Sequence, residues 1–338
     1  MDDKVKIGLI GLGRMGRIYV EALIFRIPRA ELVAVADING EAAKKIAASY
    51  RIKHWFDNYQ DLLKIEGIRG VVIAASTSVH TEIIVGAAEA GKDIFCEKPV
   101  ALTLKETDIA LMAVKKRKVK FQAGFMRRFD RGYMVAKKKI EEGKIGKPVS
   151  FKSISRDPMC PRLDYARVSG GLIVDMAIHD FDLARWLMES EVKRVCAEGG
   201  RLVFDQLREA DDIDNATINM LFSNGSLGNV EVSRNALYGY DIRTEVLGSE
   251  GGIMIGYARH TPVVLLTKKG AAHDFVPYIM ERFGEAYTNE LKYFVDCIYK
   301  DQDPSVAGQD GRAALEIALA ATQSYKEAKP VEIPLANE

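Results

Sequence analysis

Hydrophobic and polar positions along the first third of the chain alternate between two kinds of segment. Short runs of apolar and β-branched residues, such as GVVIA at 70–74, are each followed by a stretch in which apolar positions have helical spacing. Near-continuous apolar strands that alternate with helices are typical of a parallel sheet covered on both faces. The pattern predicts a doubly wound α/β (Rossmann) domain over residues 1–125, with strands within 5–23, 31–37, 70–76, 93–99 and 119–125.

After the segment GFMRRFDRGYMVAKKKIEEGKIGKP at 124–148 the pattern changes, and strands follow one another directly. Two strands flank a Ser-Asn-Gly-Ser turn within 214–236, and two more flank a Gly-rich turn within 240–257. This succession predicts an α+β domain over 126–338 with a large, mostly antiparallel open sheet. Further strands are expected in 148–157 and 261–275, helices in 171–188, 285–300 and 308–329, and an edge strand in 331–334.

Composition and charge narrow the class of protein. The chain has 338 residues, 48% of them hydrophobic, which is enough for two hydrophobic cores. Its 48 basic and 47 acidic side chains nearly cancel, so we expect a small-molecule substrate and neither nucleic acid nor membrane as partner. No apolar run is long enough to cross a bilayer and no signal peptide is recognisable, so a cytoplasmic protein is expected. The cysteines are scattered without metal-ligand spacing, which predicts no metal site; they are Cys96, Cys160, Cys196 and Cys297.

A glycine-rich turn follows the first predicted strand and opens the first predicted helix. Its sequence is Gly11-Leu12-Gly13-Arg14-Met15-Gly16. Gly11 permits a tight turn, Gly13 lets the backbone approach a pyrophosphate, and Gly16 permits close packing of helix on strand. The helix N-terminus then points at the phosphates. Because the turn lies between a strand and a helix, it predicts a dinucleotide site that includes Arg14 and Met15.

The second predicted strand ends in Asp37, about twenty residues beyond the last glycine of this turn. A carboxylate at this position can accept hydrogen bonds from an adenosine ribose, and its charge would repel a 2′-phosphate. Ile38 and Asn39 follow it, where arginines would favour NADP. NAD is therefore the predicted cofactor. Asp37 also has an alternative role as the N-cap of the next helix, and the two roles are compatible.

Ligands of doubly wound sheets bind outside the carboxyl ends of the strands, so polar residues at this edge are candidates for cofactor contacts. Ser76 and Thr77 follow one strand, and His80 lies at the start of the next helix. His80 is either such a contact or a helix-start residue without a ligand. Glu97 and Lys98 end another strand, just before Pro99, where Lys98 is either part of a solvated turn or a catalytic ammonium.

One predicted helix of the second domain carries candidate acid–base chemistry. Asp175 and His179 are four residues apart in GLIVDMAIHDFDLARWLM, which places them on one helical face. A carboxylate beside a histidine fixes the imidazole tautomer and stabilises its protonated form, as a general base requires. An ordinary structural helix pair remains the alternative.

The motifs GLGRMG, EKP, GFMRRFD and VDMAIHD occur in this order, together with Asp37. In this respect the sequence resembles the family that includes glucose-fructose oxidoreductase and inositol dehydrogenase, over nearly its whole length. Within that family, CEKP, GFMRRFDRGY, YGYDI and ERFGEAY look most like bacterial myo-inositol 2-dehydrogenases, which use NAD.

The resemblance implies roles for individual residues. Lys98 corresponds to the family's catalytic lysine, Glu97 to a cofactor-side contact, and Asp175 with His179 to the acid–base pair. Pro99 fixes the turn, and its bond to Lys98 is a candidate cis peptide. Substrate-hydroxyl contacts are expected from Arg127, Asp157 and Tyr240. Asp157 departs from the asparagine that inositol dehydrogenases carry there, and a carboxylate accepts protons where an amide also donates one.

The resulting hypothesis is that the protein oxidises a ring hydroxyl of a cyclic polyol to a ketone with NAD, with myo-inositol converted to scyllo-inosose. In it, His179 takes the hydroxyl proton and Lys98 stabilises the developing alkoxide. Alternatives are an NAD(P)-dependent dehydrogenase of scyllo-inositol or another sugar, and a non-catalytic nucleotide-binding regulator. The resemblance also implies a homo-oligomer, a dimer or tetramer that covers the open sheet face.

Overall fold

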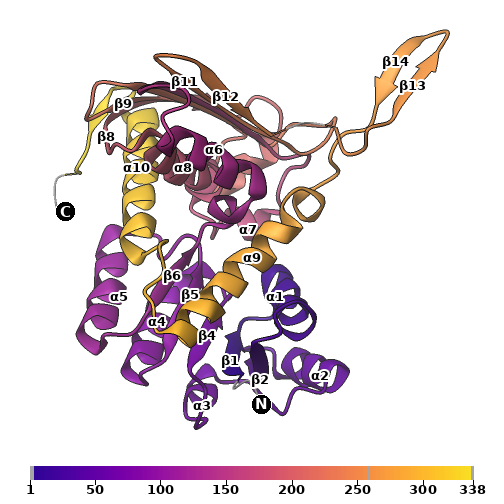
Figure 1. Cartoon of the computed structure of the whole chain (residues 1–338), viewed down its shortest axis with the longest axis vertical. Helices are drawn as coiled ribbons and strands as arrows, with labels where there is room; N and C mark the ends of the chain where they lie inside the picture. The colour runs from indigo at the N-terminus through magenta and orange to yellow at the C-terminus, as the bar shows by residue number, and fades with distance from the viewer. Residues whose placement is uncertain (1–3, 257–258, 336–338) are drawn as a thin grey trace. The chain divides into compact units, whose positions relative to one another are not determined.

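The computed structural model describes residues 4–256 and 259–335 and contains two compact units (Figure 1). Unit 1 comprises 1–126 and 285–312, and unit 2 comprises 127–284 and 313–338. The division falls within two long helices, α9 (Ile279–Lys300) and α10 (Gly308–Glu327). Unit 1 therefore includes a late segment that the domain prediction placed with residues 126–338.

Unit 1 is built on a six-stranded parallel sheet with the order β3-β2-β1-β4-β5-β6. From β1 the strand order runs in one direction through β2 to β3 and in the other direction through β4 to β6. The point between β1 and β4 is the topological switch point, where doubly wound folds bind ligands. Strands β4 and β5 are buried along nearly their whole length, as expected for a parallel sheet between helices. The strands are β1 (Val5–Ile10), β2 (Ala30–Ala36), β3 (His54–Phe56), β4 (Gly70–Ile73), β5 (Asp93–Glu97) and β6 (Phe121–Gly124).

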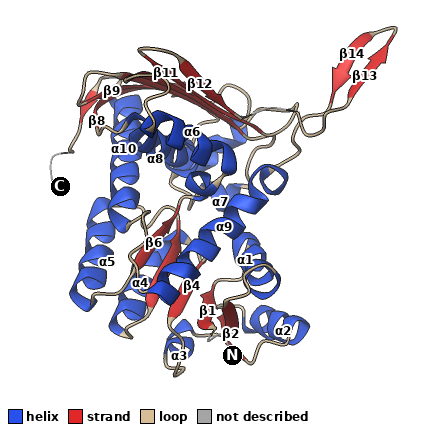
Figure 2. Cartoon of the chain, viewed as in Figure 1, coloured by secondary structure: helices blue, strands red, loops and turns tan. Residues whose placement is uncertain are grey.

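Helices alternate with these strands, as the coloured ribbon in Figure 2 shows. Their starts follow local capping chemistry. Thr103 is the N-cap of α5: its hydroxyl accepts a hydrogen bond from the backbone N–H of Glu106 at 3.2 Å and donates to the Glu106 carboxylate at 2.8 Å. The helices are α1 (Arg14–Phe25), α2 (Gly40–Tyr50), α3 (Tyr59–Leu63), the 3₁₀ turn η1 (Thr77–Val79), α4 (His80–Glu89) and α5 (Leu104–Arg117).

Unit 2 is built on a seven-stranded sheet with the order β12-β11-β7-β10-β9-β8-β15. All neighbouring pairs are antiparallel except β7 with β10, which run parallel. Buried and exposed residues alternate along β9 and β11, so one face of the sheet packs on the core. The strands are β7 (Pro148–Arg156), β8 (Val192–Gly200), β9 (Asn215–Phe222), β10 (Leu227–Ser233), β11 (Asp241–Gly248), β12 (Gly252–Ile255) and β15 (Val331–Glu332).

Helices of unit 2 lie against one face of this sheet, where α6 and α8 are seen beneath it in Figure 1. The Ser324 side chain of α10 accepts a hydrogen bond from the Ala197 N–H of β8 at 3.0 Å. The predicted fold class is confirmed. The helical segments are η2 (Met126–Phe129), α6 (Arg131–Glu141), α7 (Leu163–Ala166), η3 (Ile173–Ala177), α8 (Ile178–Met188) and η4 (Asp205–Ala210).

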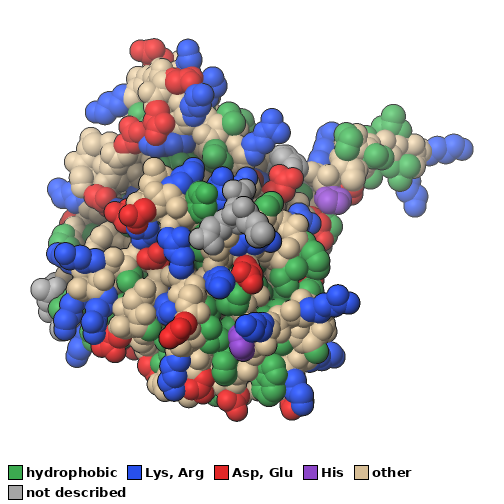
Figure 3. Space-filling view, turned by 60° about the horizontal axis from the view of Figure 1, so that its bottom comes forward, with side chains coloured by type: hydrophobic (Ala, Val, Ile, Leu, Met, Phe, Trp, Pro, Cys, Tyr) green, Lys and Arg blue, Asp and Glu red, His purple; other side chains and the backbone are tan. Residues whose placement is uncertain are grey.

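Residues 261–275 differ from the prediction that they add a strand to the large sheet. They form a separate two-stranded hairpin of β13 (Val264–Thr267) and β14 (Gly270–His273). Figure 2 shows this hairpin projecting from the sheet of unit 2, and Figure 3 shows hydrophobic side chains along it. The Pro262 that precedes its first strand, and apolar residues exposed on both strands, fit a hairpin that no sheet face covers.

Candidate functional site

The glycine-rich turn of unit 1 has the geometry of a phosphate cradle. Gly11 has φ +92°, and a Cβ there would lie 2.5 Å from the backbone nitrogen of Ala75. A Cβ on Gly16 would lie 1.9 Å from the carbonyl oxygen of Gly11, so this contact between helix and turn requires glycine. Gly13, by contrast, has open space around its Cα, which leaves its backbone accessible to a ligand. Gly11 and Gly16 thus occupy positions that require glycine, and the open Gly13 fits the predicted pyrophosphate approach, which stays a prediction.

The first turn of α1 borders this accessible backbone. Arg14 is exposed and Met15 is half-buried. Because no side chain caps the helix, its N-terminal N–H groups keep their capacity for an anion. The surface beside the turn has an open depression lined by Leu12, Gly13, Arg14, Arg17 and Ile18.

Asp37 is tied to the same turn. Its Oδ2 accepts the N–H of Leu12 at 2.6 Å, and its Oδ1 accepts the N–H of Asn39 at 2.8 Å. The N-cap of α2 is Asn39, whose side chain accepts from Ala42 at 3.2 Å, so the capping alternative for Asp37 is wrong. The Asp37 carboxylate fixes the turn beside the end of β2, and a ribose contact from it stays a prediction.

The segment after β4 carries Ser76, then Thr77 at the start of η1 and His80 at the start of α4. Ser76 is exposed and Thr77 is half-buried. His80 is buried, with Nδ1 3.0 Å from the Pro99 carbonyl oxygen and Nε2 3.0 Å from that of Ala75. Both ring nitrogens could donate to these carbonyl oxygens only in a protonated imidazolium. Burial lowers the pKa of His80, so the neutral ring is favoured and donates one of the two hydrogen bonds at a time. His80 thus braces two strand-end loops, and a cofactor contact stays a prediction for all three residues.

Lys98 directly follows β5, and its bond to Pro99 is cis, as the sequence suggested. Its backbone N–H donates to Oε2 of Glu97 at 3.2 Å. Glu97 is buried, and its Oε1 receives a short hydrogen bond from the Tyr19 hydroxyl. Burial raises the pKa of the Glu97 carboxyl, while Tyr19 and the neighbouring Lys98 lower it. The buried Glu97 carboxyl therefore fixes the backbone of Lys98 at the end of β5.

A second buried carboxyl shares the Tyr19 hydroxyl. Oε1 of Glu290, on α9, lies 3.0 Å from the Tyr19 oxygen. A hydroxyl carries one proton, so Tyr19 can donate to only one of the two carboxyls. The shorter contact is to Glu97, and the second hydrogen bond forms when Glu290 is protonated and donates to Tyr19. Burial, and next the charge of Glu97, raise the pKa of Glu290 well above its ordinary value, which agrees with this proton placement.

In unit 2, the candidate acid–base residues lie on two different kinds of helical turn. Asp175 belongs to the π-helical turn η3, and His179 lies in the first turn of α8. The π turn at Asp175 was not predicted from the sequence, and the shared face of Asp175 and His179 stays a prediction. Such turns occur frequently at functional sites. His179 is 7% exposed, so its ring is almost withdrawn from solvent.

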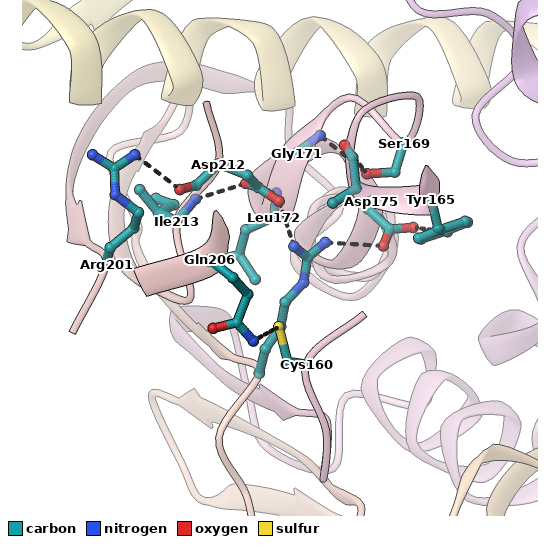
Figure 4. Close-up of polar contacts among 12 residues, drawn as sticks. Cys160, Tyr165, Ser169, Gly171, Leu172, Asp175, Arg201, Gln206, Asp212 and Ile213 are labelled. Atoms are coloured by element: carbon teal, nitrogen blue, oxygen red, sulfur yellow. Dashed lines mark hydrogen bonds and ion pairs between the residues drawn. The ribbon is translucent and has the colours of Figure 1, made fainter. Parts of the chain in front are cut away.

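Donors from two other segments hold the Asp175 carboxylate (Figure 4). The Tyr165 hydroxyl donates to Oδ1 at 2.7 Å, and Nη2 of Arg234 lies 3.3 Å from Oδ2. Arg234 also forms a short ion pair with Asp212. Neither Tyr165 nor Arg234 was predicted from the sequence to contact Asp175. The signal for Arg234 was weak, since a charged residue at a strand end normally faces solvent.

Arg127 and Tyr240 were predicted to contact substrate, and both are buried. Nη1 of Arg127 pairs with Oδ1 of Asp180 at 2.7 Å, and both of its terminal nitrogens lie 3.2 Å from the Ser155 hydroxyl. Its Nε has no hydrogen-bond partner among the described residues. Most of the Arg127 guanidinium therefore braces unit 2. The contact of Asp180 with Arg127 was not predicted from the sequence, and Asp180 is a fully buried carboxylate of α8.

Tyr240 packs edge-on against Tyr278 and Phe283, with ring centroids 5.6 and 6.2 Å away. Burial and next the charge of Asp157 raise the pKa of its hydroxyl, so Tyr240 stays a neutral donor. Asp157 follows β7, and its backbone is held by Ser233 and Ala236. Asp157 and Tyr240 thus lie close enough to interact, and their contact with a substrate stays a prediction.

Two absences complete the description of the residues at 4–256 and 259–335. Within these ranges, no group of three histidine, cysteine, aspartate or glutamate side chains is placed to hold a metal ion. Within the same ranges, no helix has the length and apolar character needed to span a membrane.

Two family models match the chain. Residues 5–125 match the oxidoreductase family's NAD-binding Rossmann fold, and residues 137–333 match the C-terminal alpha/beta domain of the same family. The prediction of NAD as cofactor is thereby confirmed.

Similar proteins align over nearly their full lengths. The chain is 39% identical over 333 residues to scyllo-inositol 2-dehydrogenase (NAD(+)) of Bacillus subtilis, an alignment that covers 98% of this chain and 97% of that one. It is 38% identical over 330 residues to myo-inositol 2-dehydrogenase of Thermotoga maritima, with 97% and 98% covered. Among solved structures, scyllo-inositol dehydrogenase from Lactobacillus casei with bound NAD(H) and scyllo-inositol superposes with a TM-score of 0.94 at 29% identity, covering 98% of this chain and 100% of that one.

Proposed function

Because the chain belongs to the glucose-fructose oxidoreductase and inositol dehydrogenase family, we propose that it oxidises a ring hydroxyl of a cyclic polyol to a ketone with NAD. The proposed substrate is myo-inositol, and its product is scyllo-inosose. One observation carries the proposal beyond family membership. The Asp175 carboxylate, held by Tyr165 and Arg234, lies in the turn that leads directly into His179, so the chain keeps an ordered acid–base set.

In this reaction the alcohol loses a hydride from carbon and a proton from oxygen. NAD, when bound, supplies the hydride acceptor, and the protein supplies positioning and electrostatics. His179 takes the hydroxyl proton as general base. Asp175 orients the imidazole and balances the positive charge that forms on it. Lys98 stabilises the developing alkoxide.

The chain's own residues fit the cofactor. The open space at Gly13 and the uncapped start of α1 provide N–H groups for a pyrophosphate. Asp37 presents a negative charge at the end of β2, which disfavours the 2′-phosphate of NADP. Cofactor contacts are proposed for the same residues as before; they are Gly11, Gly13, Arg14, Met15, Gly16, Asp37, Ser76, Thr77, His80 and Glu97.

Substrate recognition is proposed for Arg127, Asp157 and Tyr240. Tyr240 donates from its neutral hydroxyl, and Asp157 accepts hydrogen bonds from substrate hydroxyls. Arg127 contributes its positive charge, which also acts on Tyr240. A carboxylate at Asp157 favours a substrate that presents two hydroxyl donors, which both inositol isomers do.

The test is the initial rate of NADH formation from myo-inositol and NAD, with scyllo-inositol, glucose and NADP as parallel comparisons. Turnover with myo-inositol supports the proposed substrate. Turnover only with scyllo-inositol or another sugar keeps the chemistry and replaces the substrate. A protein that binds NAD but turns over none of them would favour a non-catalytic regulator.

We also propose that the protein is a homo-oligomer, a dimer or a tetramer. The outer face of the unit 2 sheet carries exposed apolar residues such as Leu227 and Leu247, and closed symmetry is the common way to cover such a face. Light scattering at micromolar concentration tests this, and a monomer there would refute it.

A further inference from the structure

Arg234, which contacts the Asp175 carboxylate, is itself a buried charged residue. It follows β10 directly, and only 1% of its surface is exposed. Its backbone N–H donates to the Asp214 carbonyl at 2.9 Å, which fixes the chain at that point. The guanidinium faces two carboxylates, those of Asp212 and Asp175. Arg234 therefore links Asp175, an expected site residue, to Asp212.

Asp212 anchors this link to the backbone. Its Oδ1 accepts the N–H of Leu172 at 2.8 Å and the N–H of Ile213 at 2.8 Å, and its Oδ2 takes the short ion pair with Arg234. Leu172 directly precedes the π turn η3, which carries Asp175. Asp212 thus holds both the start of that turn and the arginine that reaches Asp175 (Figure 4).

The two oxygens of Asp175 are held by different donors. Tyr165 donates to Oδ1 from the short helix α7, and Arg234 approaches Oδ2 from the end of β10. An adjacent cation and a hydrogen bond to the charged form both favour an ionised carboxylate, and donors from two directions fix its orientation. Asp175 is therefore presented as a fixed anion.

This arrangement is difficult to explain by stability alone. A buried arginine is costly to desolvate, and replacing a buried ion pair by packed apolar residues is often neutral or stabilising. Here a guanidinium is buried between two aspartates at the start of the segment that carries Asp175 and His179. We propose that Arg234, with Tyr165 as its counterpart, is a positioning residue that fixes Asp175 for its work with His179. This inference rests on the proposed function.

The test compares three single variants of the full chain. Tyr165→Phe removes only a hydroxyl from a side chain that is 46% exposed, so its fold should be preserved. Arg234→Lys keeps the charge and loses the planar fork. Arg201→Lys is the matched control. Arg201 is an arginine of the same region that donates to the backbone carbonyl of Asp212 at 3.3 Å, and the proposal gives it no part in holding Asp175.

The readouts are kcat, the KM for NAD and the pH dependence of kcat/KM with the polyol that the wild type oxidises. Each variant at Tyr165 or Arg234 removes or weakens a donor to the Asp175 carboxylate. The carboxylate then interacts more strongly with the protonated ring of His179, so the pKa of this general base rises. We expect the acid limb to move to higher pH by about one unit and kcat to fall about tenfold in Tyr165→Phe, with a larger loss in Arg234→Lys. The KM for NAD and all parameters of Arg201→Lys should stay at wild-type values.

Cys160 is a further titratable group near Arg234, and burial raises the pKa of its thiol. Asp214 accepts the Arg234 backbone N–H through its carbonyl oxygen. If a Cys160→Ser variant keeps the acid limb of kcat/KM at the wild-type pH, the Cys160 thiol is excluded as the source of a shift in that limb. If the wild type is active but Tyr165→Phe keeps its kcat and pH profile, the inference is overturned while the proposed function stands. If the wild type turns over no polyol, the proposed function fails and the inference fails with it. Thermal melting of each variant separates lost positioning from lost folding.

Discussion

The shared hydroxyl of Tyr19 leads to a specific prediction about Glu290. This glutamate is fully buried on α9, and its Oε2 has no hydrogen-bond partner among the described residues. The contact of its Oε1 with Tyr19 requires a protonated carboxyl, because Tyr19 donates its only proton to Glu97. We therefore expect Glu290 to be neutral in the folded protein at pH values where an exposed glutamate is ionised.

The variant Glu290→Gln tests this, because a glutamine has nearly the same shape and can donate an N–H to Tyr19. In the wild type, the raised pKa of Glu290 contributes stability below the ordinary carboxyl pKa of 4.5, and that contribution is lost as the pH rises towards the folded-state pKa. Above pH 4.5, Glu290 ionises in the unfolded chain but stays protonated in the folded protein, so the unfolded state becomes relatively more stable as the pH rises. Over this window, the free energy of unfolding of the wild type should fall relative to Glu290→Gln by about 1.4 kcal/mol per pH unit.

The assay is urea unfolding followed by circular dichroism at a series of pH values from about 4 to about 8. Glu285→Gln is the matched control, because Glu285 is an exposed residue on the same helix. The difference between Glu290→Gln and wild type should widen with pH, while Glu285→Gln should run parallel to wild type. If the curve of Glu290→Gln also ran parallel to wild type, Glu290 would be ionised in the folded protein and the proton placement would be wrong.

Three further changes have expected outcomes. Lys98→Met should lower kcat by at least about 100-fold through loss of alkoxide stabilisation, while the NAD dissociation constant, measured by fluorescence titration, changes less than about twofold; equal losses in both would refute its catalytic role. Asp37→Ser should reduce the preference for NAD over NADP in kcat/KM by about tenfold, and an unchanged preference would count against the ribose contact. Asp180→Ala should lower the free energy of unfolding by about 3–5 kcal/mol in urea, because Arg127 stays buried without its carboxylate; a loss below about 1 kcal/mol would contradict this.

Local sequence patterns predicted the fold of unit 1 well. The glycine spacing of the first turn, the apolar strands and the helices between them all depend on neighbours within a few residues. The edge strand predicted in 331–334 is also present as β15, at one end of the large sheet beside β8. The hairpin at 261–275 was assigned to the wrong sheet, because strand propensity does not reveal which partner a strand takes.

The buried polar contacts were the part that the sequence did not reveal. Glu290 meets Tyr19 from 271 positions away, and Arg234 meets Asp175 across 59 positions. Neither pair has a local signature, since a glutamate in a helix or an arginine at a strand end is ordinarily a surface residue. The π turn at Asp175 was hidden for a related reason, because a change in helical register leaves the apolar periodicity of its flanks intact.

The surroundings of the Glu290 and Asp175 carboxyls favour opposite protonation states. Glu290 is buried beside another carboxyl, so its neutral form is favoured. Asp175 receives an arginine and a tyrosine hydroxyl, so its charged form is favoured. The pH dependence of stability should therefore respond to Glu290→Gln, and that of turnover to Tyr165→Phe. If each variant changed both dependences equally, the two carboxyls would be coupled, and the separate assignments of their protons would have to be replaced by one shared equilibrium.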